Sequence, residues 1–402
     1  MHTLNALQAV KDRFGGLVFL DLTQYDLRNA HHRLGEHAGQ QVQKILHQRF
    51  ERLDALKIGH LMQQAHSCAD TLRGKIEDKK LDSRLRGAVR EYLDCLEAWA
   101  EGAGLVGFEH PVLADQQSIS PMVLALFLQH DSTGCQTGMY RQEDGSVILW
   151  HTEEDIEFEE GSGFDQLRLA SFNVGDGNDP VTMHAFIYPD LLPGPAFGWR
   201  SDGYAQAVDS LHVRTSTDQK TGILANVATW MTLRLGPDCE PGKVIKDMGL
   251  YFDGYALNAV SVRGGKAHAE KHEFTANQIL STILGDQPGS YLFQVNIFSQ
   301  KKHRWVRELE DLPPEDRRWY KRREWYTRKA MQHKDHTTSE AGDMRFFFDL
   351  ICSRSGIRWP YANTDMKAYL ILRQSTQEAE IWLGHGPALP TDQYSVIQIP
   401  LA

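Results

Sequence analysis

The chain has 402 residues, of which 41% are apolar and 24% charged, and its formal net charge is −10. This length suits one large or two medium-sized globular domains, and the acidic balance argues against nucleic acid as a partner. The longest apolar run, Pro121 to Leu128, is too short to cross a bilayer. Because Lys11, Asp12 and Arg13 stand where a signal peptide needs apolar residues, we expect a cytoplasmic protein without a membrane partner.

The number and spacing of the cysteines also suit a reducing cytoplasm. The five cysteines are odd in number and widely spaced, and no Cys-x-x-Cys pair occurs. This pattern suggests neither a disulfide framework nor a thiolate zinc site. No predicted strand is followed by a Gly-x-Gly-x-x-Gly turn, and we expect no metal and no cofactor. The cysteines are Cys68, Cys95, Cys135, Cys239 and Cys352.

Hydrophobic periodicity divides the chain into a helical first third and a mixed remainder. Helical spacing runs from about residue 36 to 104, and further helices are predicted near 223–235, 241–249, 275–283 and 315–332. Alternating patterns predict strands at 135–141, 146–151, 166–172, 182–188, 204–213, 256–263, 267–274, 290–298, 366–373 and 378–383. Short turns predict hairpins at Asp144-Gly145, Gly264-Gly265 and 375–377. Such an order predicts an α+β fold of two packed sheets covered by helices.

The pair Gly134-Cys135 opens the first of these strands. Glycine tolerates strained backbone angles and leaves room for a thiol to attack the preceding carbonyl. If the bond between the two residues breaks, Cys135 carries a thiol and an α-amine, whose ordinary pKa of roughly 7.7 to 8.0 suits a base working near neutrality. The structural alternative is that Cys135 is simply a small buried strand residue.

Several separated segments extend this pattern. They are residues 97–105 (EAWAEGAGL), Gly134-Cys135 with Asp144-Gly145 ten positions on, 151–154 (HTEE), 192–198 (LPGPAFG) with 202–205 (DGYA), 256–260 (ALNAV) with 269–270 (AE), and 293–296 (FQVN). In their order and spacing, from roughly residue 85 onward, the chain resembles the isopenicillin N acyltransferase-like family of N-terminal-nucleophile (Ntn) hydrolases.

The resemblance implies a four-layer αββα sandwich that is made as a precursor and cut between Gly134 and Cys135. Residues 1–134 would form a mainly helical pro-segment or α-subunit, and residues 135–402 would form the catalytic β-subunit. The two parts would stay together as a heterodimer. The implied activity is hydrolysis or acyl transfer on a linear amide, an N-acyl amine or N-acyl amino acid.

The resemblance also implies roles for individual residues. Cys135 would be the nucleophile and, through its freed α-amine, the base. Asn296 would donate a side-chain N–H bond to the oxyanion. An acidic residue about eighteen positions after the cysteine would hold the nucleophile, which is Glu153 without a gap or Glu154 with one inserted residue.

An arginine in the later predicted helix would complete the site, either Arg318 or Arg322. His151 and Arg200 stand where the family commonly has asparagine, next to the acid and before 202–205 respectively, and we expect them to support the site or contact substrate. These departures, together with Leu224-Ala225 in place of Pro-Arg, leave an alternative open. The protein would then be an uncut, non-catalytic relative that binds a small molecule.

Three other patterns receive structural explanations. The run 153–160 holds six carboxylates in eight residues but lacks the interleaved glycines of a calcium loop. His268 and His272 lie four apart on a predicted strand, about 13 Å along it and too far for one metal ion. Residues 301–329 contain eleven Lys or Arg and six Asp or Glu among aromatic residues, which an amphipathic helix with a solvated face explains without nucleic acid.

Overall fold

The structure is a computed structural model of the 402-residue chain. The residues that it describes are 18–113, 119–129, 134–154, 167–175, 180–213, 219–276, 278–299, 314–334, 346–347, 366–375, 378–385 and 395–400.

Helices dominate the described part of the first third of the chain. Three long helices follow Asp26, Asp54 and Asp82, and each of these side chains accepts a hydrogen bond from a backbone N–H group of the first turn. The helices are α2 (Leu27–Arg52), α3 (Ala55–Glu77), α4 (Ser83–Gly102) and α5 (Pro121–Leu128), with a 3-10 turn η1 (Pro111–Leu113) before α5.

Helices α2 and α4 cross closely because each carries a glycine at the crossing point. A Cβ atom at Gly35 would collide with the carbonyl oxygen of Trp99, and one at Gly102 would collide with that of His32. Any larger residue at either position would push the two helices apart.

The larger sheet has eight strands in the order β1-β4-β5-β6-β7-β8-β9-β10. Neighbours are antiparallel except β1 and β4, which pair in parallel and so tie the helical first third to the rest of the sheet. The strands are β1 (Val18–Asp21), β4 (Arg168–Asn173), β5 (Thr182–Ile187), β6 (Phe197–Arg200), β7 (Tyr204–Ser210), β8 (Tyr251–Arg263), β9 (Lys266–Ala276) and β10 (Gln278–Ile283).

The smaller sheet has six antiparallel strands in the order β11-β2-β3-β12-β13-β14. It joins segments far apart in the sequence, since β3 pairs with β12. The strands are β2 (Gly134–Arg141), β3 (Val147–Glu154), β11 (Tyr291–Gln294), β12 (Met366–Gln374), β13 (Glu378–His385) and β14 (Ser395–Pro400).

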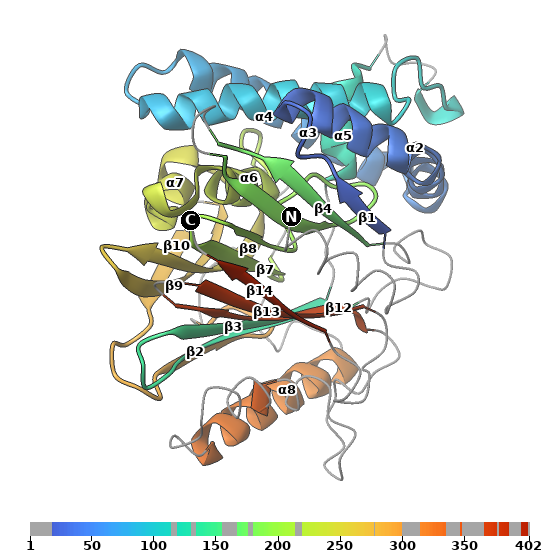
Figure 1. The fold of residues 1–402 in the computed structure, drawn as a ribbon. Coiled ribbons are helices and arrows are strands. Elements are labelled where there is room, and N and C mark those ends of the chain that lie inside the picture. Colours follow the sequence, from blue (N-terminus) through green and yellow to red (C-terminus); the bar gives the residue numbers. More distant parts are fainter. Residues whose placement is uncertain are drawn as a thin grey trace.

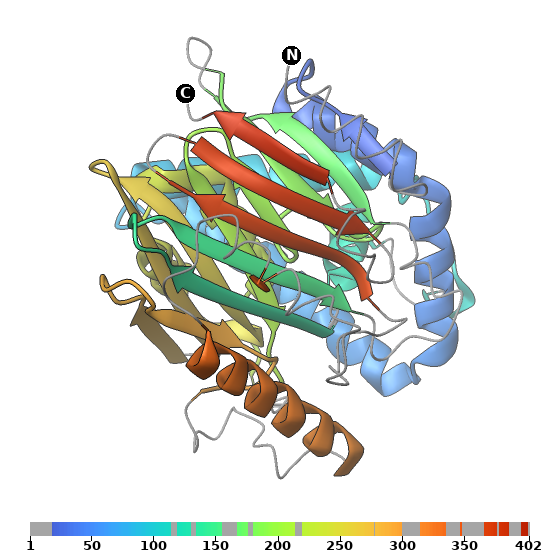
Figure 2. The ribbon, with the colours of Figure 1, turned by 60° about the horizontal axis from the view of Figure 1, so that its bottom comes forward.

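The two sheets lie face to face and helices cover their outer faces (Figure 1). Helices α2–α5, with α6 (Ala225–Leu235) and α7 (Pro241–Met248), lie on the larger sheet, and the 3-10 turn η2 (Gly236–Asp238) joins α6 to α7. Helix α8 (Pro314–His333) lies beyond the smaller sheet, where Thr327 accepts a hydrogen bond from Gln136 of β2. Figure 2 shows β2, β3 and β12–β14 side by side in front of the larger sheet.

Most predicted elements are confirmed within the described residues, including the hairpins at Asp144-Gly145 and Gly264-Gly265. The helix predicted at 275–283 is wrong. The chain reverses at Ala276, where φ is +36°, and β10 then pairs along β9. The β-branched residues Ile279, Thr282 and Ile283 suit this edge strand better than a helix. Strands β1, β6 and β14 were not predicted.

The two sheets enclose an interior that is apolar over one part and polar over another. Met139, Val147 and Leu149 of the smaller sheet pack against Phe197 and Trp199 of the larger one. Toward the start of β2 and the end of β3, the buried side chains become polar. Burying polar groups costs free energy unless they are hydrogen-bonded. A buried polar cluster is therefore a candidate for a functional site.

None of the helices in the described part of the chain has the length and apolar character needed to span a membrane.

Candidate active site

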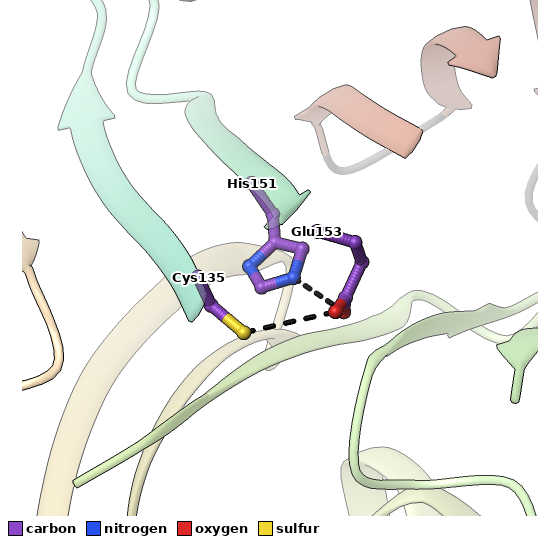
Figure 3. A group of neighbouring side chains, drawn as sticks. All are labelled: Cys135, His151 and Glu153. Atoms are coloured by element: carbon purple, nitrogen blue, oxygen red, sulfur yellow. Dashed lines mark hydrogen bonds and ion pairs between the residues drawn. The ribbon is translucent and has the colours of Figure 1, made fainter. Parts of the chain in front are cut away.

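Cys135 and Glu153 lie opposite each other on β2 and β3. The register is set by the hairpin that turns at Asp144-Gly145, and residues directly opposite in an antiparallel pair point to the same face. Both side chains are buried, and the Cys135 thiol donates a hydrogen bond to Oε2 of Glu153 with a sulfur–oxygen distance of 3.6 Å (Figure 3). The sequence left the choice between Glu153 and Glu154 open, and Glu153 is the acid beside the thiol.

His151 lies two residues before Glu153 and therefore on the same face of β3. Its Nε2 atom is 2.7 Å from Oε1 of Glu153, and its Nδ1 atom is 2.7 Å from Oγ1 of Thr137, the residue opposite it on β2. When the Glu153 carboxylate is ionised it only accepts hydrogen bonds, and Nε2 of His151 is then the donor. Figure 3 shows the His151 ring beside the Glu153 carboxylate, with the Cys135 sulfur close to the same carboxylate.

Tyr188, just after β5, completes the set of groups around Glu153. Its hydroxyl donates a hydrogen bond of 2.5 Å to Oε2 of Glu153. The carboxylate thus accepts from the Cys135 thiol, the His151 ring and the Tyr188 phenol. Three donors satisfy this buried carboxylate and fix its position beside the sulfur atom.

Asn296 holds the backbone of Cys135. The Cys135 N–H group donates to Oδ1 of Asn296 at 3.1 Å, and Nδ2 of Asn296 donates to the carbonyl oxygen of Ser210 at 2.8 Å. Asn296 has a φ of +55°, a left-handed conformation that asparagine tolerates better than most residues. The carboxamide therefore reaches Cys135 from a turn beyond β11.

A buried ion pair on β9 holds this turn in place. Nζ of Lys271 donates to Oε1 of Gln294 at 3.0 Å and to Oγ of Ser299 at 3.0 Å. Glu273 accepts from the Ser299 N–H group at 2.8 Å, and the Lys271 and Glu273 charges are 3.6 Å apart. Contacts on both sides of Asn296 thus fix the turn to the larger sheet.

Asp209 is a third buried acid at this end of the interior. Nδ2 of Asn258 donates to its Oδ2 atom at 3.0 Å. Burial raises the pKa of Asp209 to about 7, while the nearby His151 ring and the Thr137 hydroxyl act in the opposite direction. The carboxyl group therefore belongs to the same electrostatic environment as the His151–Glu153 pair.

The trio of Cys135, His151 and Glu153 also brings three possible metal-ligand atoms within 4.8 Å of one another. Two atoms bound to one tetrahedral zinc ion at 2.0–2.1 Å would lie about 3.3 Å apart. The 2.7 Å separation of His151 Nε2 and Glu153 Oε1 is instead that of a hydrogen bond. The geometry therefore fits a hydrogen-bonded network better than a metal centre.

The other predicted residues are placed differently. Arg200 points toward the helices, with its guanidinium paired to Asp202 and donating to the carbonyl oxygen of Leu233 at the end of α6. Strand alternation explains this, since the neighbouring Trp199 points into the space between the sheets. Arg318 is exposed on α8, where its Nε atom donates to the carbonyl oxygen of Pro314. The side chains of Arg322 and Glu154 lie outside the described residues.

Sequence reasoning missed Thr137, Tyr188 and Asp209. Thr137 could have been found from its position two residues after Cys135, which puts both on one strand face. Asp209 could have been found as the lone acid in the otherwise uncharged strand 204–210. Tyr188 carries no comparable signal, because only the packing of the two sheets brings β5 to β3.

Comparison with protein-family models and with curated proteins finds no match for this chain.

The thiol and the backbone nitrogen of Cys135 are thus each hydrogen-bonded to a different side chain. Glu153 accepts from the sulfur and Asn296 accepts from the nitrogen. The thiol and the backbone nitrogen of one residue are therefore positioned by two side chains that come from different parts of the chain.

Proposed function

We propose that the protein is a self-processing cysteine amidohydrolase of the N-terminal-nucleophile type. The observation that carries the proposal is that both reactive atoms of Cys135 are bound by buried side chains, the nitrogen by Asn296 and the sulfur by Glu153. A cysteine that served only for packing would still need an acceptor for its buried backbone N–H group, but it would not need a buried carboxylate beside its thiol. The preceding Gly134 leaves the peptide carbonyl open to attack.

Processing begins when the Cys135 thiolate attacks the carbonyl carbon of Gly134. The carbon–nitrogen bond breaks, the nitrogen takes up a proton, and a thioester links Gly134 to the sulfur. Water hydrolyses this thioester, which leaves a carboxylate on Gly134 and a free α-amine and thiol on Cys135. Asn296 keeps the new amine in place because its Oδ1 atom already accepts from that nitrogen.

Turnover uses the same atoms on a substrate amide. The α-amine removes the thiol proton, the sulfur attacks the substrate carbonyl, and an acyl-thioester forms as the protonated amine product leaves. The Asn296 amide nitrogen has two N–H bonds, one directed at Ser210 and a second that can donate to the oxyanion. Water then releases the acid, whereas a second amine at the same step would make the enzyme an acyltransferase.

The fold is compatible with the four-layer αββα sandwich of the isopenicillin N acyltransferase-like family, to which we assign the chain as part of this proposal. The N-terminal fragment would stay bound after cleavage. Strand β1 is hydrogen-bonded to β4, and helices α2–α5 share one apolar core with α6 and the larger sheet. Arg49 of α2 also pairs with the buried Asp190 at 2.8 Å.

A panel of N-acyl amines and N-acyl amino acids, assayed for released amine, tests the activity. The wild-type protein should release amine from at least one class, and Cys135→Ala should neither cut itself nor release amine. Cys239→Ala, which removes a cysteine on the far side of the larger sheet, serves as the control and should retain both activities. Turnover by the Cys135→Ala protein would refute the proposal.

A further inference from the structure

The turn that follows β5 connects Glu153 of the site to the helices of the N-terminal part. Tyr188 begins this turn, and its hydroxyl donates to Oε2 of Glu153 at 2.5 Å. The N–H group of Leu191 donates back to the carbonyl oxygen of Tyr188 at 3.2 Å, which closes the turn. Residues 188–192 are buried throughout, except that no claim is needed for the fourth-to-last backbone group of β5. We call residues 188–192 the Tyr188 turn.

Gln129 binds this turn on the side of the helices. It follows α5 directly and is buried. Its Nε2 atom donates to the carbonyl oxygen of Asp190 at 3.0 Å, and its Oε1 atom accepts from the N–H group of Leu192 at 3.4 Å. One side-chain amide thus fixes the backbone on both sides of Leu191.

The orientation of the Gln129 amide is itself determined by a neighbour. Nδ2 of Asn226, on α6, donates to Oε1 of Gln129 at 2.8 Å. An amide oxygen only accepts and an amide nitrogen only donates. The oxygen must therefore face Asn226 and Leu192, and the nitrogen must face the Asp190 carbonyl group.

Arg49 of α2 adds a contact to the same turn. Its Nη2 atom lies 2.8 Å from Oδ2 of the buried Asp190, and its Nη1 atom donates to the carbonyl oxygen of Leu128 at 2.7 Å. Hydrogen bonds between charged groups are about twice as strong as those between neutral ones. Arg49 and Gln129 both precede Gly134, so the part of the chain before the proposed cut holds the Tyr188 turn.

We propose that Gln129 is a positioning residue for the candidate site. By holding the Tyr188 turn, it keeps the Tyr188 hydroxyl on Glu153 and the Glu153 carboxylate beside the Cys135 thiol. The catalytic consequence rests on the proposed function, whereas the effect on the hydrogen bond between Tyr188 and Glu153 does not.

The Tyr188 hydroxyl matters because of the oxygen that it binds. Oε2 of Glu153 accepts from both Tyr188 and the Cys135 thiol, while Oε1 faces His151. A hydrogen bond of 2.5 Å is at the short end of the O–H···O range and depends on exact placement of both groups. A displacement of the turn by about 0.5 Å is enough to disturb such a geometry. The carboxylate would then lose its hold on the side that faces the thiol.

The structural alternative is that Gln129 only joins α5 to the larger sheet. In that case, removing its amide would lower stability but leave the hydrogen bond between Tyr188 and Glu153 unchanged. Under the proposal, the N-terminal part would act in the mature site instead of being a spent pro-segment.

Carbon-13 NMR of the tyrosine ring carbon that bears the hydroxyl separates the two cases without turnover, in an uncut Cys135→Ala background. The Tyr188 signal is assigned by its loss in Tyr188→Phe, and Glu153→Gln shows how it moves when its acceptor is weakened. We expect Gln129→Met, which keeps the length but not the hydrogen bonds, to move the signal in the same direction. Gln142→Met changes another buried glutamine, in the β2–β3 hairpin, and should leave the signal unchanged.

A second variant covers the case in which Gln129→Met does not fold. Gln129→Glu has nearly the same shape and keeps an acceptor for Leu192, but it has no N–H bond for the Asp190 carbonyl group. We expect a smaller shift of the Tyr188 signal in the same direction. A signal that stays at its parent position in Gln129→Glu, or in folded Gln129→Met, would overturn the proposal whether or not the protein proves to be an enzyme.

Kinetics in the otherwise wild-type protein test the catalytic consequence. Tyr188→Phe and Gln129→Met should each lower kcat about 10- to 100-fold with a smaller change in KM. The double variant should be no slower than Tyr188→Phe alone, because both changes act through one hydrogen bond. Additive losses would contradict a role through Tyr188. A shifted Tyr188 signal in a protein without amidase activity would support the role of Gln129 and refute the proposed function alone.

Discussion

The backbone nitrogen of Cys135 is hydrogen-bonded to the side chain of Asn296, a residue 161 positions later in the chain, at 3.1 Å. The two meet because β11 pairs with β2 and because the chain turns at Asn296 with a φ of +55°. The contact joins the start of β2 to the turn that carries the Asn296 carboxamide. We therefore expect both the proposed processing and the proposed turnover to depend on this one side chain.

Asn296→Asp should separate the two roles of the carboxamide. Aspartate keeps an acceptor for the Cys135 nitrogen and tolerates the left-handed backbone, but it has no N–H bond for an oxyanion. We expect kcat to fall about 10²- to 10³-fold, as when one oxyanion donor is lost elsewhere. Asn296→Gly should be impaired further, since it also loses the acceptor. Steady-state kinetics of processed protein measure this, and an Asp variant as active as wild type would exclude Asn296 as the donor.

Replacing Glu153 by glutamine should slow both self-cleavage and turnover. The amide is nearly the same size but has no negative charge to accept from the thiol, the imidazole and the phenol together. We expect the cut chain to appear at least ten times more slowly. Gel electrophoresis of samples taken over time measures this rate. Glu143→Gln, at an exposed position of the β2–β3 hairpin, is the control. Equal cleavage rates in the two variants would count against a role for Glu153.

The Lys271–Glu273 pair should show strong coupling in a double-mutant cycle. Both side chains are buried, so Lys271→Met leaves Glu273 as an unpaired buried charge and should lower the free energy of unfolding by about 3–5 kcal/mol. Lys271→Met combined with Glu273→Leu should be less destabilised than the single Lys271 variant. Urea denaturation measures both. Additive losses would show that the pair does not act as a unit.

Two buried aspartates predict how stability depends on pH. Burial raises the pKa of Asp209 to about 7 and that of Asp253 to about 6, from an ordinary value of 3.8. Below the ordinary value both folded and unfolded states are protonated. As the pH rises, the unfolded state loses its proton first, so each residue lowers the free energy of unfolding until its folded pKa is reached.

Substitution by asparagine should remove these contributions. Relative to wild type, Asp209→Asn should gain stability progressively between pH 4 and about 7, by up to about 4 kcal/mol, and Asp253→Asn between pH 4 and about 6, by up to about 3 kcal/mol. Any lost hydrogen bond adds an offset that does not depend on pH. Denaturation curves at several pH values give the difference in free energy of unfolding between each variant and the wild type. If this difference did not change with pH for Asp209→Asn, a raised pKa would be contradicted.

Much of the architecture could be predicted because local pattern and final structure agree. The alternation after Cys135 and the Asp144-Gly145 turn lead to the β2–β3 hairpin. The β10 region could not be predicted, since its sequence also suits a helix and pairing with β9 decides the outcome. Strand β1 has only four residues and pairs with β4 about 150 residues later, which no local signal reveals.

The site was predictable to the extent that strand register decides it. Cys135, Glu153 and His151 belong to one hairpin, so their shared face follows from alternation around one turn. Arg200 does not lie beside these residues because its strand alternates the other way, and Arg318 lies on an exposed face of α8. Asp209 and Tyr188 reach the site from the larger sheet. The hydrophobic periodicity of a strand predicts which of its faces is buried, but it does not predict how two sheets pack against each other.

The most direct test of the account is the intact mass and N-terminal sequence of freshly purified, active protein. Self-processing predicts two chains that remain associated, with one of them beginning at Cys135, and a Cys135→Ala preparation that stays as one chain. An active preparation that contains only the uncut chain would contradict the account, because Cys135 would then have no α-amine to act as its base.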